Sequence, residues 1–191
     1  MVEESKQEFE QQEATVEQEH VGAVTARKVA MHQAYAEVVQ ASQDVIIRQG
    51  AAKEVHAQDV TIRQGAVVTV DADSVHMVQG GAAIVRTSDA HLGPGTVTGA
   101  VLADTVKMEQ ASAQFMLARD SVEMDQSAVG FLVGQHITAK DSAAVVMIAN
   151  TVDGNVNVAM DRQTAITFGA AFGAALGLVL GVFGLVWRRR S

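Results

Sequence analysis

The sequence predicts an all-β fold, a single-stack β-helix (β-solenoid) of about nine 15–16-residue coils, followed by one C-terminal transmembrane α-helix. Three observations predict this architecture. Apolar residues recur in columns every 15 or 16 residues over most of the chain. Within each repeat they stand two residues apart, which is the periodicity of a β-strand with one buried face. Near the C-terminus, residues 165–187 form an uncharged apolar run.

The repeat is clearest in the middle of the chain, where QDVIIRQGAAKEVHA at 43–57 recurs as QDVTIRQGAVVTVDA at 58–72. One apolar column comprises Val29, Val45, Val60, Val75, Ala90, Val106, Val122, Ile137 and Val152. A second comprises Met31, Ile47, Ile62, Met77, Leu92, Met108 and Met124, and a third Val24, Val39, Val55, Val70, Val85, Val101, Met116, Leu132 and Met147. Because such a coil buries its apolar side only against its neighbours, the repeat predicts a stacked rod.

Each repeat also contains a polar corner between its apolar pairs. One position holds Gln33, Gln49, Gln64, Gln79, Gln110 and Gln126, with Pro94 and Asp141 in two turns, and the next position is small, as in Gly50, Gly65, Gly80 and Gly95. We expect the glycines to supply the backbone dihedrals of a sharp turn. We also expect the stacked glutamines to hydrogen-bond from coil to coil. The predicted turn ladder comprises Gln49, Gly50, Gln64, Gly65, Gln79 and Gly80.

A coiled coil is the main alternative, because 15 residues also make four turns of a slightly overtwisted α-helix. Glycine recurs at the corners, Gly93-Pro94-Gly95 interrupts the middle of the chain, and valine is abundant. These features disfavour helices and favour strands joined by turns.

The predicted solenoid, residues 21–158, resembles the bactofilins, polymer-forming bacterial cytoskeletal proteins whose core is a compact β-helix with Val/Ile columns and Gly turns. The resemblance is architectural and assigns no functional residue to this sequence. It implies end-to-end polymerisation near a membrane, without a nucleotide.

No catalytic, cofactor-binding or metal-binding residues are predicted. The chain has no cysteine, which excludes thiolate chemistry. His76 and His91 stand one coil apart, but no third metal ligand accompanies them. Since coil length varies by only one residue, no loop is long enough to build a cleft, and we expect a protein that is not an enzyme.

Charge is unevenly distributed along a chain whose net charge is −8. Residues 1–20 are rich in Glu and Gln, which indicates an acidic arm that is disordered or a short helix. Lysine and arginine do not form a basic stripe in the solenoid, so nucleic acid is not an expected partner.

The C-terminal segment predicts a membrane anchor. A helix of residues 165–187 would span roughly 34 Å, enough for a hydrocarbon core of about 30 Å. Residues 159–164 link it to the solenoid, and residues 188–191 form a basic tail. Gly169, Gly173, Gly177 and Gly181 lie four apart and suggest helix self-association in lipid, while Trp187, Arg188, Arg189 and Arg190 suit the membrane interface.

Two orientations of this anchor are open. The positive-inside rule places the arginines in the cytoplasm and the solenoid outside. The N-terminus lacks the pattern of a signal peptide, however, so tail-anchored insertion with a cytoplasmic solenoid is the favoured expectation.

Two functional hypotheses follow. The first is a membrane-anchored structural scaffold whose partners are the lipid bilayer and further copies of itself. The second is a monomeric, membrane-tethered binding module that presents a flat β face or the acidic arm to a protein partner.

Overall fold

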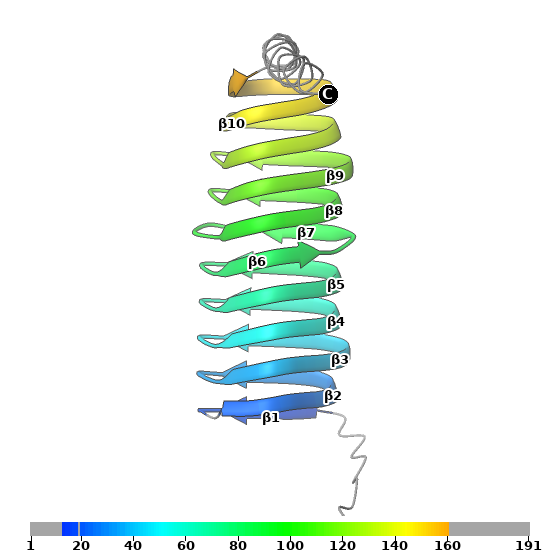
Figure 1. Cartoon of the computed structure of the whole chain (residues 1–191), viewed down its shortest axis with the longest axis vertical. Helices are drawn as coiled ribbons and strands as arrows, with labels where there is room; N and C mark the ends of the chain where they lie inside the picture. Colours follow the sequence, from blue (N-terminus) through cyan, green and yellow to red (C-terminus); the bar gives the residue numbers. More distant parts are fainter. Residues whose placement is uncertain (1–12, 19, 161–191) are drawn as a thin grey trace, which may run out of the picture.

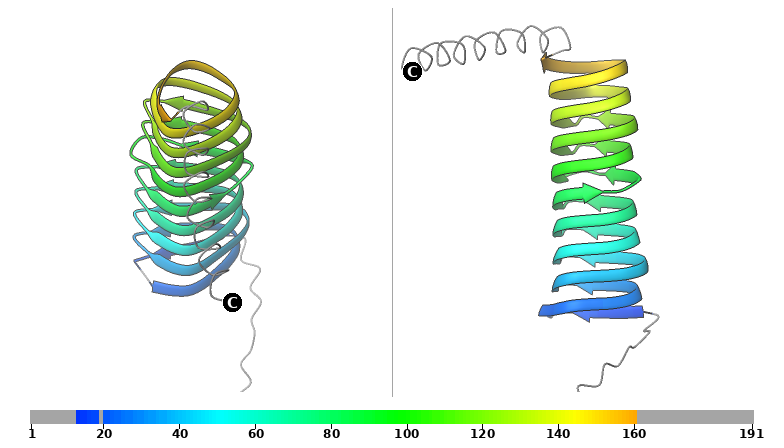
Figure 2. Two further views of the ribbon diagram at one scale, coloured as in Figure 1. Left: turned by 45° about the horizontal axis from the view of Figure 1, so that its top comes forward. Right: turned by 45° about the vertical axis from the view of Figure 1, so that its right-hand side comes forward.

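The computed structural model of the chain describes residues 13–18 and 20–160, and these residues form a parallel β-solenoid of about eight turns (Figure 1). Each strand pairs in parallel with the next along the rod, and β1 and β10 lie at opposite ends of the stack (Figure 2). The strands are β1 (Glu13–Glu17), β2 (His20–His32), β3 (Tyr35–Arg48), β4 (Ala51–Arg63), β5 (Ala66–Val78), β6 (Gly81–Arg86), β7 (Asp89–Leu92), β8 (Val97–Glu109), β9 (Ser112–Asp125) and β10 (Ala128–Met160).

A typical long strand, such as β4 or β5, forms one coil. In β4 the strand begins after the glutamine corner, bends at Lys53 and Glu54, bends again at a second corner near Gln58, and ends just before Gln64. The one-residue differences in coil length are absorbed mainly at the second corner, where the registers shift between Ala26 and Lys28 and between Ala103 and Thr105. The backbone ladder therefore continues past each insertion.

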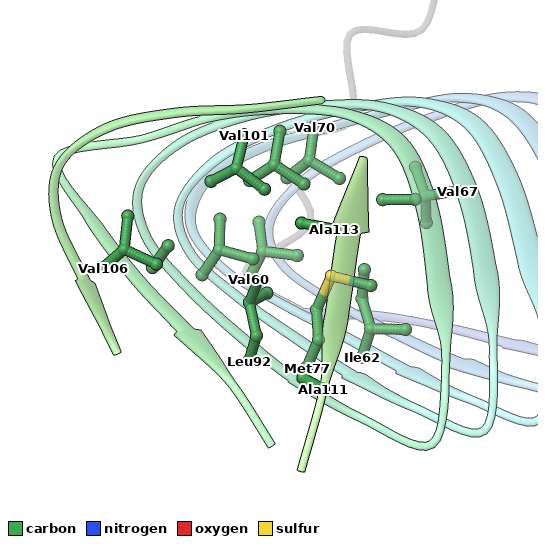
Figure 3. Close-up of a cluster of buried hydrophobic side chains, with 14 of the residues drawn as sticks. Val60, Ile62, Val67, Val70, Met77, Leu92, Val101, Val106, Ala111 and Ala113 are labelled. Carbon is green, nitrogen blue, oxygen red and sulfur yellow. The ribbon is translucent and has the colours of Figure 1, made fainter. Parts of the chain in front are cut away.

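The interior consists of the predicted apolar columns. Val60, Ile62 and Met77 are at most 1% exposed and stack on equivalent residues of neighbouring coils (Figure 3). In the described part of the chain this core holds no aromatic side chain, since Val, Ile, Leu, Met and Ala fill it. Inward residues two apart, repeated in every coil, are the reason that this sequence forms this fold.

The solenoid begins earlier than the sequence predicts. The expected arm of residues 1–20 is wrong over Glu13–Glu17, which form β1 and pair with β2. Val16 pairs with Met31 and is 8% exposed, so it extends the second apolar column by one coil. Acidic composition obscured this coil because its glutamates point outward. Residues 1–12 lie outside the described residues.

The far end also differs from the sequence expectation. Val152, the last predicted member of the first column, is 44% exposed. The buried part of that column runs from Val29 to Ile137, in keeping with about eight turns rather than the predicted nine. β10 ends at Met160, and the predicted transmembrane helix lies outside the described residues.

Candidate functional site: the glutamine corner and an apolar face

The glutamine corner has an unusual backbone. Gln18, Gln33, Gln49, Gln64, Gln79, Gln110, Gln126 and Asp141 all have φ between 47° and 55°. This left-handed region costs a residue with a side chain about 1–2 kcal/mol. The sequence-based assignment of the turn dihedral to glycine is therefore wrong at Gly50, Gly65 and Gly80, because the glutamine before each of them adopts it.

The glycines are needed for a different reason, which is that a side chain would not fit at these positions. A Cβ at Gly50 would lie 2.7 Å from the carbonyl oxygen of Ala34, and a Cβ at Gly65 would lie 2.7 Å from that of Gly50. The same carbonyls accept coil-to-coil hydrogen bonds, for example from Ala66 N to Gly50 O at 3.1 Å. A side chain at Gly65 would push against backbone that the ladder holds in place.

The turn that contains Pro94 is shifted by one residue from the predicted alignment. Proline cannot adopt a positive φ, and Gly95 takes that conformation instead, with φ of 74°. Thr96 then occupies the small, buried position, since Ser112 N donates to Thr96 O as Val97 N donates to Gly80 O. The placement of Pro94 in the glutamine column and Gly95 in the small column is corrected accordingly.

The exposed glutamine side chains form hydrogen-bonded ladders along the rod. Gln49 Nε2 donates to Gln64 Oε1 at 3.2 Å, and Gln64 Nε2 donates to Gln79 Oε1 at 3.1 Å. The same ladder begins at Gln18, which the sequence analysis missed although it lies 15 residues before Gln33. A second, separate pair joins Gln110 to Gln126 at 3.4 Å, so the coil with Pro94 separates two runs.

A shallow, open groove of about 480 Å³ follows the first ladder. Its walls are Gln49, Gly50, Gln64, Gly65, Ala66, Gln79, Gly80, Gly81 and Gly95. Amide groups at a regular spacing beside bare glycine backbone could hold an extended polar chain. The groove is a surface for binding, with no titratable side chain in its walls.

A second feature, which the sequence analysis missed, is an apolar face on the wall between the two corners. We define the apolar face by the outward side chains of Leu102, Phe115, Leu117, Phe131, Val133, Val145 and Ile148. Phe115 is 58% exposed and Leu117 is 51% exposed. Leu102 pairs with Leu117 and Leu117 pairs with Val133, so the side chains form unbroken rows.

The same rows are charged nearer the N-terminus. The row of Leu102 continues through Arg86 and Asp71 to His56. Arg86 Nη1 lies 3.6 Å from Asp71 Oδ2, and His56 Nε2 lies 2.9 Å from Glu54 Oε1. One wall of the rod therefore changes from a charged network to an apolar surface along its length.

The two histidines that the sequence places one coil apart, His76 and His91, are in contact. The rings of His76 and His91 meet edge to face with centroids 4.6 Å apart. Burial lowers the pKa of His76, with smaller contributions from His91 and Arg63. No cluster of three or more His, Asp or Glu side chains suited to a metal ion occurs within residues 13–18 and 20–160.

The predicted membrane residues are Gly169, Gly173, Gly177, Gly181, Trp187, Arg188, Arg189 and Arg190, and all lie outside the described residues. Within the part of the chain that the structure describes, there is no helix with the length and apolarity that crossing a bilayer requires. The anchor therefore remains a prediction from the sequence.

Comparison with known proteins returned no match, whether to protein-family models, to curated sequences or to solved structures. The parallel solenoid is architecturally compatible with a bactofilin-like fold. This compatibility concerns the fold alone.

Proposed function

We propose that this protein is a membrane-anchored structural β-solenoid that self-associates as a scaffold and has no catalytic activity. The observation that carries the proposal is the uniformity of the rod. Between Glu13 and Met160 the longest connection between consecutive strands is residues 93–96. Enzymes built on solenoids need longer loops to shape a cleft around substrate, whereas a uniform rod suits a spacer or a building block.

The anchor is the second part of the proposal. The apolar run of residues 165–187 follows the last strand within a few residues, so insertion would hold the rod close to the bilayer. Copies in one membrane would then share the same polarity. Glycines at spacing four would allow close contact between the inserted helices.

Membrane fractionation of the full chain tests the anchor. We expect the protein to stay in the membrane pellet after alkaline carbonate extraction. The double variant Leu178→Arg/Leu180→Arg should move to the soluble fraction, because each arginine costs about 2.5–3.5 kcal/mol at the centre of an inserted helix. The matched control Leu178→Ile/Leu180→Ile should stay in the pellet. A soluble wild-type chain would refute membrane anchoring, and protease protection in vesicles would show which side the solenoid occupies.

Energy transfer between two differently labelled full chains in vesicles tests self-association. We expect transfer that exceeds the level from random proximity, and a decrease when Gly173→Leu/Gly177→Leu widens the predicted helix contact. Transfer at the random level for the wild type would contradict a scaffold.

The groove beside the first glutamine ladder favours one second candidate, a membrane-tethered binding module. Its exposed amides and glycine backbone would bind an extended protein segment or another linear polar polymer. A monomeric protein in vesicles whose partner is lost on Gln64→Ala would support this candidate over the scaffold.

A further inference from the structure

The apolar face carries no charged side chain. The four wall segments 97–103, 112–118, 128–134 and 143–149 contain no Asp, Glu, Lys or Arg. Seven residues of strand and four coils cover about 20 by 19 Å along the surface, or roughly 400 Å², with one bend in each strand between inward residues such as Ala113 and Met116. A patch of this size lies within the range of the largest patches on monomers, which often mark an interaction site.

The geometry of this wall restricts what can cover it. Its backbone groups are paired with the neighbouring coils, as in Leu102–Leu117 and Phe115–Phe131, so a partner meets side chains only. The rings of Phe115 and Phe131 lie 6.4 Å apart and tilted, and they form a ridge at the bend of each strand. Beyond this bend, the outward row of Leu117 and Val133 suits a second sheet packed face to face, about 10 Å away.

The position of the face along the rod favours a second copy of the chain as its partner. It lies on the last coils before the C-terminal segment, and if that segment is inserted in a bilayer, every copy holds its face at the same height. A two-fold axis parallel to the rods then brings two such faces together. We propose that the apolar face binds the same face of a second copy, side by side in one membrane. This inference rests on the proposed anchoring.

The area of the face agrees with pairing between tethered copies. Two faces would bury roughly 800 Å², below the 1,200–2,000 Å² typical of stable complexes. Pairing is therefore weak between copies in dilute solution. Confinement to a membrane raises the effective concentration of the second copy and allows the same contact to persist.

Two other occupants fit less well. Residues 97–153 carry seven acidic and three basic residues, a net charge of −4 that opposes contact with an anionic lipid surface. The chain's own residues 165–187 are apolar throughout, so as a helix lying on the face they would leave their opposite side in water.

Cysteine cross-linking tests the proposal cleanly because the chain has no native cysteine. The full chain with Leu117→Cys is reconstituted in phosphatidylcholine vesicles and treated with a short bis-maleimide. The matched control is Thr138→Cys, which is exposed in a neighbouring coil but beyond the second corner. We expect several-fold more linked dimer from the Leu117→Cys chain than from the control.

Equal linking at both positions, or none at Leu117→Cys, would overturn the pairing. A bimane label on Leu117→Cys that brominated lipid quenches would assign the face to lipid instead. In a Val133→Cys chain, adding Leu117→Asp should reduce linking strongly, whereas adding Thr138→Asp should not. If energy transfer persists while Leu117→Cys does not link, the inference fails and the scaffold survives; if the full chain leaves the membrane pellet, the proposed function itself fails.

Discussion

The N-terminal half of the solenoid, β2 to β6, and the C-terminal half, β8 to β10, share one interior and have different exteriors. Val55 and Leu132 are both 0% exposed and belong to the same column. One residue further along the strand, His56 belongs to a charged network, whereas Val133 belongs to the apolar face. The inward residues therefore determine the shape of the coil, and the outward residues can differ and determine what the surface binds.

The two halves also build their corners differently. In the first half glycine follows glutamine at three corners, Gly50, Gly65 and Gly80, and Ala34 follows Gln33. In the second half Ser127 and Ser142 take that position, and Ser127 Oγ donates to Asp125 O at 2.8 Å while accepting from Ala111 N at 3.3 Å. At this position the serine side chain makes two hydrogen bonds, whereas the glycine of the first half has no side chain. The corner therefore forms in both halves with different contacts.

The largest expected effect tests whether the interior is equivalent in the two halves. Ile62→Ala and Ile137→Ala remove the same side chain from positions that are 0% and 1% exposed. We expect each to lower the free energy of unfolding by about 2–5 kcal/mol, from lost transfer energy and a residual cavity. Urea unfolding of the full chain in detergent measures both. A loss below about 1 kcal/mol for one variant would show that its half is not packed as the other is.

A smaller effect is expected at the corners, where the two halves differ in chemistry. Gly65→Ala places a Cβ 2.7 Å from Gly50 O, and overpacking of this kind costs about 1–3 kcal/mol. The counterpart Ser127→Ala keeps its Cβ and loses hydrogen bonds, for about 0.5–1.5 kcal/mol. Thermal unfolding followed by circular dichroism compares them. A neutral or stabilising Gly65→Ala would refute the steric account, since replacing an unconstrained glycine stabilises proteins.

The interior could be predicted from the sequence because each coil repeats the same inward pair. The corner could not be predicted fully, since composition marks glycine as the residue for positive φ while the structure gives that φ to Gln49 and Gln64. The sequence does not show how close the backbone of the neighbouring coil lies to each glycine, and this distance is known only once the coils are stacked. The alignment of repeats by sequence placed Pro94 one position wrong for the same reason. The spacing between residues along the chain carries no information about their dihedral angles.

The apolar face could not be recognised by the same reasoning. Segments such as QFMLA at 114–118 and GFLVG at 130–134 look like continuous core strands, because inward and outward residues are both apolar. Only the register, which pairs Leu117 with Val133 on the outer side, separates the two sets. Counting back 15 residues from Met31 and Gln33, by contrast, would have found Val16 and Gln18.

The glutamine ladder provides a third test, because it runs through the first half and is reduced to one pair in the second. Gln64→Ala removes hydrogen bonds to two neighbours, at 3.2 and 3.1 Å, while keeping the strained φ of 55°. We expect a loss of about 1 kcal/mol for these exposed bonds. Gln64→Gly loses the same bonds and relieves the strain, so it should be about 1 kcal/mol more stable than the alanine variant.

Differential scanning calorimetry of the two Gln64 variants gives the comparison. Gln126→Ala is the counterpart in the second half, where the side chain is hydrogen-bonded to one ladder neighbour, Gln110. Equal stability of Gln64→Ala and Gln64→Gly would mean that the left-handed conformation carries no cost at this corner. The strain attributed to the whole glutamine column would then be wrong.

The smallest expected effect is a pH dependence of stability that arises at His76 in the first half. His76 and His91 belong to one row of outward residues along the rod. In the next two coils the same row holds Lys107 and Glu123. Burial lowers the pKa of His76, helped by His91 and Arg63, so the folded chain binds a proton there less readily than the unfolded chain. Between the unfolded pKa of about 6.5 and the lower folded value, stability should fall as the pH falls, and level off below that window.

Thermal unfolding between pH 7.5 and 5, values chosen to bracket a histidine pKa of about 6.5, measures this slope. His76→Gln should flatten it slightly. Because His76 is only partly buried and water screens its neighbours, the change should be small. An unaltered slope in His76→Gln would show that burial in this row does not penalise the charged imidazole.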